Sequence, residues 1–423
     1  MWRVPLSDLN YGPEEEAAVL DVLRSRWLTM GPRTEEFEAQ VAAYLDVKHA
    51  IAVANCTCGL HLAYQLLLAA SHSSSSVAST SSGTARKPVV LVPDITFVAS
   101  SNAAISSGAR PTFCDIIDLK TPTARATHAQ ALIDSASGAA AIFCLVHYAG
   151  FDAGTDEFLK LSRARGMMLV EDAAHAIGAR NSAGQMLGTI GDIGCYSFFS
   201  NKNLATGEGG LLVTNNDDIA TGLRLLRSHG MTSLTYQRHR SKSHGYDVVS
   251  IGHNYRCTEI MAALGIEQLK KLDAGNERRR QLYRLYCEAF GDESRLLVPF
   301  AESTEAIDRA ACHIFPLVCA GAGLRDRIRD ALTNAGVQTS HHYPPVHTFS
   351  YYRKTVGGGV RIPEMHELGD GFPPAWAGGR AAFPLAASVH YAARQITLPL
   401  HPNLKNSELE EIVSIVLRTV AES

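Results

Sequence analysis

Short runs of consecutive apolar residues recur through the first half of the chain, among them "AIAVA", "VVLV", "AIFCLV" and "MMLVED". Their hydrophobic positions are adjacent rather than alternate, which is typical of strands that are buried on both faces. Segments with helical periodicity lie between them, at residues 56–70 and 154–166, and two earlier helices are predicted at 13–25 and 34–45. Apolar strands separated by helices predict an α/β fold with a mostly parallel sheet. In such sheets, ligands bind at the carboxyl ends of the strands.

The pattern changes after about residue 255. Residues 258–290 predict one or two long amphipathic helices, and shorter segments follow, ending in a helix at 406–421. This arrangement resembles a smaller α+β domain. The sequence therefore predicts a large α/β domain at 1–255, whose N-terminal segment can pack on the small domain, and a small domain at 256–423.

Two stretches interrupt these patterns. Residues 71–86, "SHSSSSVASTSSGTAR", are serine-rich and predict a flexible surface insertion, because such a composition cannot bury enough apolar area to become ordered. Residues 354–384 are rich in glycine and proline and predict a long loop.

The composition excludes some classes of protein. The chain has 423 residues, of which 46% are hydrophobic, and 39 Lys and Arg against 42 Asp and Glu give a net charge of -3. We therefore expect no nucleic-acid surface, and no apolar run is long enough to cross a membrane. The start of the chain lacks a signal-peptide pattern, so a cytoplasmic location is predicted. The nine cysteines lack zinc-site spacing, and we expect free thiols and no metal.

Two ionisable side chains are placed where they could act on one ligand. Asp172 lies just past the apolar run in "LVEDAAHAIGA", with His175 after it. Lys202 lies further on, in "YSFFSNKNLATGEGG", before a glycine-rich turn. Pyridoxal phosphate needs this combination, since its aldehyde forms a Schiff base with an amine and its pyridine nitrogen needs a carboxylate partner.

The other needs of this cofactor also have candidates. Its phosphate requires backbone N–H groups at the start of a helix, which Cys56 and Thr57 of "NCTCGL" can supply, and hydroxyls such as that of Ser197. An aromatic side chain on the face of the ring would complete the site. Phe97 of "DITFVAS", which follows a predicted strand, is the candidate.

These motifs occur in a familiar order. The succession "NCTCGL", "VPDITFVAS", "FCDI", "LVHYAG", "VEDAAHAIGA", "GDIGCYSFFSNKNLATGEGG", "RSHGM", "GHNYR" and "HHYPPVH" resembles the DegT/StrS family of pyridoxal phosphate-dependent sugar aminotransferases. The resemblance runs from about residue 5 to 402. It implies the type I fold of pyridoxal phosphate transferases, with a mostly parallel sheet of the seven-stranded type.

The resemblance also implies a role for each matching residue. Lys202 matches the Schiff-base lysine, and Asp172 matches the carboxylate paired with the pyridine nitrogen. His175 matches a residue that contacts the phenolic oxygen of the cofactor, and Phe97 matches the aromatic stacked on its ring.

The remaining matches concern the phosphate, the partner subunit and the substrates. Ser197 and the amides of Cys56 and Thr57 match the phosphate cup, although Cys56 stands where the family usually has glycine. Asn254 matches an asparagine that reaches the phosphate from the partner subunit, which implies a homodimer with shared sites. Substrate-side roles are expected for four neighbouring residues: His341, His342, Tyr343 and His347.

The resemblance implies an aminotransferase that moves an amino group from glutamate or glutamine to a ketone. The acceptor would be a sugar or a sugar-like compound, which includes nucleotide-linked ketosugars, cyclitol ketones and other natural-product intermediates. Two alternatives remain open. One is an elimination or dehydration on the same scaffold, although the family's dehydratases carry histidine at the position of Lys202. The other is a non-catalytic regulatory subunit that keeps the fold.

Overall fold

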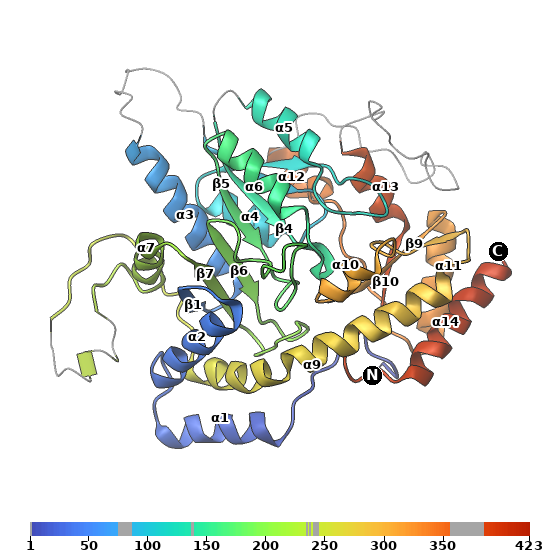
Figure 1. The fold of residues 1–423 in the computed structure, drawn as a ribbon, viewed down its shortest axis with the longest axis horizontal. Helices are drawn as coiled ribbons and strands as arrows, with labels where there is room; N and C mark the ends of the chain where they lie inside the picture. Colours follow the sequence, from blue (N-terminus) through green and yellow to red (C-terminus); the bar gives the residue numbers. More distant parts are fainter. Residues whose placement is uncertain are drawn as a thin grey trace.

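The computed structural model describes residues 2–74, 87–136, 139–233, 236, 238–239, 245–355 and 385–423. Its larger sheet has seven strands in the order β1-β7-β6-β5-β4-β2-β3. Figure 1 labels β1, β7, β6, β5 and β4 of this sheet. Only β7 runs antiparallel to its neighbours, so the prediction of a mostly parallel sheet is confirmed. The strands are β1 His49–Val53, β2 Val89–Pro93, β3 Arg110–Cys114, β4 Ala140–Val146, β5 Met168–Asp172, β6 Ile193–Ser197 and β7 Gly210–Thr214.

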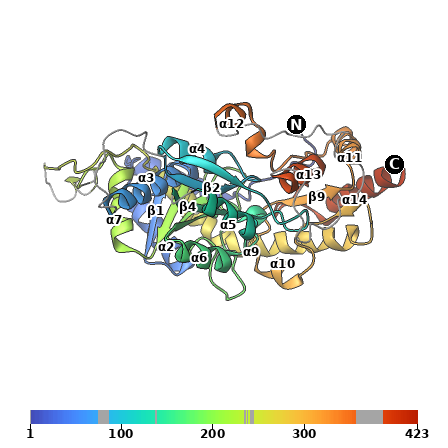
Figure 2. The same cartoon turned by 90° about the horizontal axis from the view of Figure 1, so that it is seen from above.

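Helices cover both faces of this sheet, as the consecutive apolar positions predict. One face packs against α3, α4 and α7, and the other packs against α2, α5, α6 and the first half of α9. Figure 2 shows α3 and α4 on one side of the strands and α6 and α9 on the other. These helices are α2 Pro32–Leu45, α3 Cys56–Ser74, α4 Ala99–Ser106, α5 Ala126–Ser135, α6 Thr155–Ala164, α7 Asp217–Arg227 and α9 Glu259–Phe290.

A second core forms around an antiparallel sheet of three strands, in the order β10-β9-β8. Val4, near the N-terminus, is buried in this core and pairs with Val337. The remaining elements are α1 Pro13–Ser25, η1 Tyr148–Gly150, β8 Leu296–Leu297, α10 Thr304–Arg309, β9 Phe315–Cys319, α11 Ala322–Asn334, η2 Val346–Thr348, α12 Ser350–Thr355, α13 Ala386–Arg394, β10 Gln395–Leu398 and α14 Asn406–Ala421.

The long helix α9 joins the two cores. It starts after Thr258, whose hydroxyl accepts the backbone N–H of Met261 and so satisfies one of the first-turn donors. Met261 is buried against the large sheet, whereas Tyr286 and Phe290 are buried in the small core. One continuous helix therefore serves both cores, and the exact division at residue 255 stays a prediction.

The predicted helices at 13–25 and 406–421 are confirmed, and residues 258–290 form one helix rather than two. Residues 71–74 continue α3, because extending a helix costs less than starting one. The rest of the predicted 71–86 insertion lies outside the described residues, as do residues 356–384 of the predicted long loop. No helix in the described part of the chain has both the length and the apolar character that a membrane span requires.

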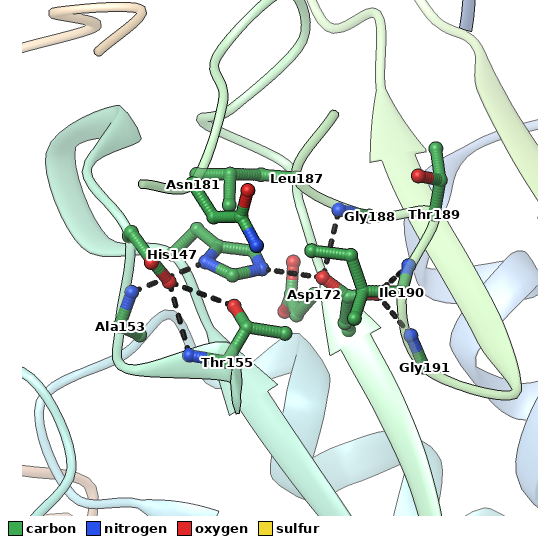
Figure 3. A network of polar contacts seen from close by, with 12 residues as sticks. His147, Ala153, Thr155, Asp172, Asn181, Leu187, Gly188, Thr189, Ile190 and Gly191 are labelled. Carbon is green, nitrogen blue, oxygen red and sulfur yellow. Dashed lines mark hydrogen bonds and ion pairs between the residues drawn. The ribbon is translucent and has the colours of Figure 1, made fainter. Parts of the chain in front are cut away.

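A buried carboxylate fixes the end of β5. Glu171 is fully buried, and one of its oxygens accepts the N–H groups of Ile190 and Gly191 at 2.7 and 2.6 Å. The other oxygen accepts from Gly188 N at 2.8 Å and faces His147 Nε2 at 2.9 Å. Figure 3 labels these partners, His147, Gly188, Ile190 and Gly191. The turn that leads into β6 is thus tied to β5, directly beside the residue that ends the strand.

We expect the substitution Glu171→Gln to lower the free energy of unfolding by about 2–4 kcal/mol, since the new amide group would face donors that need an acceptor. Urea denaturation measures the change. Glu157→Gln is the matched control, because Glu157 is exposed on α6, and it should change the stability by less than about 0.5 kcal/mol. Equal effects of the two substitutions would contradict this role of Glu171.

Candidate active site

A cavity of about 410 Å³ opens at the carboxyl ends of β2, β4, β5 and β6. Its position is the one expected for a ligand site in a parallel sheet. Nine of the residues singled out in the sequence line it, namely Cys56, Thr57, Phe97, Asp172, His175, Ser197, Lys202, His342 and Tyr343.

Lys202 lies on the turn between β6 and β7, where its own N–H donates to the carbonyl of Phe199 at 2.8 Å. Burial lowers the pKa of its ammonium group from 10.5 to about 8, and the negative charge of Asp172 opposes this shift. An appreciable fraction of the amine is therefore neutral near physiological pH, which is the form that acts as a nucleophile or base.

Asp172 ends β5 and is only 6% exposed. Its two oxygens accept from different donors: Oδ2 from Ser100 Oγ at 2.7 Å, and Oδ1 from the N–H of Ala174 at 3.2 Å. Burial raises its pKa, while these hydrogen bonds and the charge of Lys202 act in the opposite direction. The carboxylate is thus held in one orientation at the floor of the cavity.

His175 and Tyr343 form a neutral hydrogen-bonded pair. The ring of His175 accepts the N–H of Ala149 at Nδ1 (3.3 Å), so its proton is on Nε2, which donates to Tyr343 Oη at 3.1 Å. Burial and the nearby Lys202 charge hold the pKa of His175 well below its ordinary value. The pair can therefore present hydrogen bonds to a ligand without adding charge to the cavity.

The start of α3 offers an anion site. Asn55 caps this helix, since its side-chain oxygen accepts the N–H of Cys58 at 2.9 Å. Cys56 and Thr57 form the first turn beside the cavity, where backbone donors and the helix dipole favour negative charge. Strand β7 passes so closely that a Cβ on Gly210 would lie 2.5 Å from Cys56 N, and only glycine fits there.

The other predicted residues differ in their surroundings. Phe97 is 59% exposed and lies on the rim, with its ring centroid 6.1 Å from that of Tyr343. His342 Nδ1 lies 2.9 Å from the hydroxyl of Thr397. His341 lines an adjoining cavity of about 530 Å³, which shares Phe97, His342 and Tyr343 with the first.

The structure does not bring two of the predicted residues to either cavity. His347 is buried, and its Nδ1 lies 2.6 Å from Asp94 Oδ2, so it is not part of the described lining of either cavity. Asn254 is exposed and pairs with Ser228, away from the lysine of its own chain. Its expected action from a partner subunit stays a prediction.

Sequence reasoning missed several residues of the site. Asn201 and Glu208 line the cavity, and the side-chain oxygen of Asn201 is buried without a hydrogen-bond partner among the described residues. Ser100 orients Asp172, and His313 Nε2 lies 3.5 Å from Lys202 Nζ. Only His313 gave a signal, as a polar residue at the start of the apolar stretch "ACHIFPLV".

Comparisons with known proteins identify the class. The sequence matches the DegT/DnrJ/EryC1/StrS aminotransferase family over residues 10–368. The spore coat polysaccharide biosynthesis protein SpsC of Bacillus subtilis is 31% identical over 98% of this chain and 96% of its own length. A UDP-4-amino-4,6-dideoxy-N-acetyl-beta-L-altrosamine transaminase of Campylobacter jejuni is 30% identical over 84% of this chain and 87% of its own length.

Solved structures agree with this result. Helicobacter pylori PseC, an aminotransferase involved in pseudoaminic acid biosynthesis, superposes with a TM-score of 0.82 at 25% identity and covers 99% of both chains. The protein is thus an aminotransferase of the pyridoxal phosphate-dependent class. It belongs to the DegT/DnrJ/EryC1/StrS family, which confirms the predicted resemblance and the predicted reaction class. Aminotransferase therefore describes the protein better than dehydratase or regulatory subunit.

We expect the substitution Gly210→Ala to lower the free energy of unfolding by about 1–3 kcal/mol, because the added methyl group must push β7 away from the start of α3. Thermal or urea unfolding checks this. Gly245→Ala is the control, since a Cβ there meets no atom of the described residues within 4 Å. If Gly210→Ala proved as stable as the control, the close contact between β7 and α3 would not constrain the site.

Proposed function

We propose that this enzyme moves an amino group from glutamate or glutamine to a ketone on a sugar or sugar-like ring, with pyridoxal phosphate bound between Lys202 and Asp172. The observation that carries the proposal is the placement of a partly buried lysine with a lowered pKa and a buried, doubly hydrogen-bonded carboxylate in one cavity. Membership of the family supports the same cofactor.

The residues present fit this cofactor. Lys202 offers the amine, Asp172 offers the partner for the pyridine nitrogen, and the first turn of α3 offers donors for the phosphate. The unpaired oxygen of Asn201 is a buried acceptor that a bound ligand can satisfy. When bound, pyridoxal phosphate supplies an aldehyde that captures amines and a ring that takes up the electrons left when a Cα proton departs.

The side chains of this chain then have distinct tasks. Lys202 Nζ takes the Cα proton of the amino donor and returns it, since a pKa of about 8 lets the group exist in both forms at working pH. Asp172 keeps a negative charge against the ring nitrogen. His175 Nε2–H, which contacts Tyr343 Oη, donates a hydrogen bond at the phenolic oxygen without carrying charge.

The acceptor is proposed to lie in the adjoining cavity. Aromatic side chains line it, including Phe97, Phe349, Tyr351 and Tyr352. Flat aromatic faces suit the apolar faces of a sugar ring, and the two named relatives above act in polysaccharide or amino-sugar chemistry according to their names. A screen of nucleotide-linked ketosugars and cyclitol ketones with amine-loaded enzyme would identify the acceptor. A cytoplasmic location stays a prediction from the sequence.

We expect Lys202→Ala to abolish the absorption band of lysine-bound pyridoxal phosphate and to reduce turnover by at least about 10³-fold, because the variant loses both the covalent anchor and the base. Lys160→Ala, on the exposed surface of α6, should keep both the band and the turnover. An unchanged spectrum in Lys202→Ala would refute the proposed function.

We also propose a homodimer in which Asn254 completes the partner's phosphate site. If so, Lys202→Ala and Asn254→Ala homodimers are each impaired, but a mixed dimer of the two chains contains one site in which both residues are intact. Co-expression with two affinity tags isolates the mixed dimer. About half of the wild-type turnover per dimer is expected, whereas no recovery would show that Asn254 does not act across the interface.

A further inference from the structure

His313 lies beside the amine of Lys202, yet the reaction as described gives it no task. It is 4% exposed and lies two residues before the start of β9. Its backbone is fixed on both sides, since its N–H donates to the carbonyl of Ala149 at 2.8 Å and its carbonyl accepts from Arg279 at 3.1 Å. The ring centroid lies 4.3 Å from that of His175. The imidazole is therefore held in one place by packing and by the backbone.

Its tautomer is also fixed, by a chain of two amides. Asn276 donates through Nδ2 to the carbonyl of Ile177 (3.0 Å), so its oxygen is the atom that accepts from Asn203 Nδ2 at 2.7 Å. Asn203 Nδ2 also donates to the carbonyl of Ala311 at 2.8 Å, which leaves the oxygen of Asn203 facing His313 Nδ1 at 2.9 Å. An amide oxygen only accepts, so His313 Nδ1 carries the proton.

This leaves a lone pair on Nε2, the atom that faces Lys202 Nζ at 3.5 Å. The ring stays neutral, because burial and the neighbouring cationic or titratable groups hold the pKa of His313 well below its ordinary value. A neutral amine that donates one N–H to this nitrogen keeps its own lone pair for a proton or an aldehyde carbon in the cavity.

We propose that His313 is a positioning residue for Lys202: its Nε2 lone pair accepts an N–H of the free amine and so leaves the lone pair of that amine available to the cavity. The amides of Asn203 and Asn276 serve this by fixing which nitrogen of the imidazole carries the proton. The inference rests on the proposed function for its catalytic meaning, but the hydrogen bond itself is a property of the protein without cofactor.

Other groups also act on the lysine and must be kept constant in a test. Asp172 and Cys56 favour its charged form, and burial favours the neutral form. The titratable or charged groups that face Lys202 or His313 from the surrounding elements are Cys56, Asp172, His175, Glu208, Arg279, His342 and Tyr343. None of them needs to be altered if the substitutions are confined to position 313.

The test measures the pKa of Lys202 in the full-length protein freed of any bound aldehyde. Trace acetylation with acetic anhydride at a series of pH values, read at the Lys202 peptide by mass spectrometry, should give a midpoint near 8 for the unmodified protein. In His313→Phe we expect this midpoint to fall by about one unit, because the ammonium form loses its acceptor in a buried site.

Two further substitutions separate hydrogen bonding from packing. An asparagine side chain at position 313 can reach Asn203 but not the amine of Lys202, so His313→Asn should lower the midpoint as His313→Phe does. If His313→Phe does not fold, His313→Asn takes its place in the test. Gln places a polar atom near the position of Nε2, so His313→Gln should restore the midpoint. An unmoved midpoint in both His313→Phe and His313→Asn would overturn the proposal, as would a Gln variant shifted as far as these.

A measurement on the unsubstituted protein gives a second check. In protein labelled with ¹⁵N-histidine, Nε2 of His313 should show the shift of an unprotonated nitrogen at neutral pH, and a protonated Nε2 would overturn the proposal. These readouts do not depend on cofactor or turnover. If Lys202→Ala kept the cofactor band, the proposed function would fail, while the pKa of Lys202 would still report on His313.

Discussion

The site depends on a partly buried amine and a buried carboxylate that share one cavity. Removing water from a charged group is costly, and it shifts the pKa of Lys202 down and that of Asp172 up, toward their neutral forms. Hydrogen bonds to Asp172 from Ser100 and Ala174 work against this cost, and so does the attraction between the two groups. The result is a lysine that can exchange a proton near neutral pH beside a carboxylate with a fixed orientation.

Such a balance requires a rigid frame, and the frame is built from polar contacts behind the cavity. Glu171 binds the turn before β6 to the strand that carries Asp172, and Gly210 lets β7 lie against the start of α3. Asn203, next to Lys202 in the chain, is tied to α9 through Asn276 and to the carbonyl of Ala311. Residues adjacent in sequence to the reactive groups, Glu171 and Asn203, thus hold them, and their hydrogen bonds offset the cost of burying these two polar side chains.

The sequence predicted those parts of the fold that depend on local patterns. Runs such as "VVLV" indicated buried strands, and the motifs around Asp172 and Lys202 indicated which strand ends form the site. The direction of β7 could not be predicted, because "GLLVT" is equally apolar whether the strand is parallel or antiparallel. The contact of His313 with Lys202 joins residues from two cores, and the pattern around each residue says nothing about the other. The local pattern around Asn254 likewise contains no information about whether this residue contacts a partner subunit, as proposed.

The histidines of the site contribute shape and hydrogen bonds rather than charge. Burial lowers the pKa of His342 to about 3 and that of His341 to about 4, and it holds those of His175 and His313 well below their ordinary values. Imidazolium cations are thus not available to hold anionic groups in the described part of the cavity. A phosphate there must be met by the first turn of α3 and by hydroxyls, and the carboxylates of an amino donor need either Lys202 or a cation from outside this lining. Because these histidines are neutral, they place no second positive charge beside Lys202. Such a charge would keep the amine of Lys202 in its neutral form, so that it could not take up and return a proton.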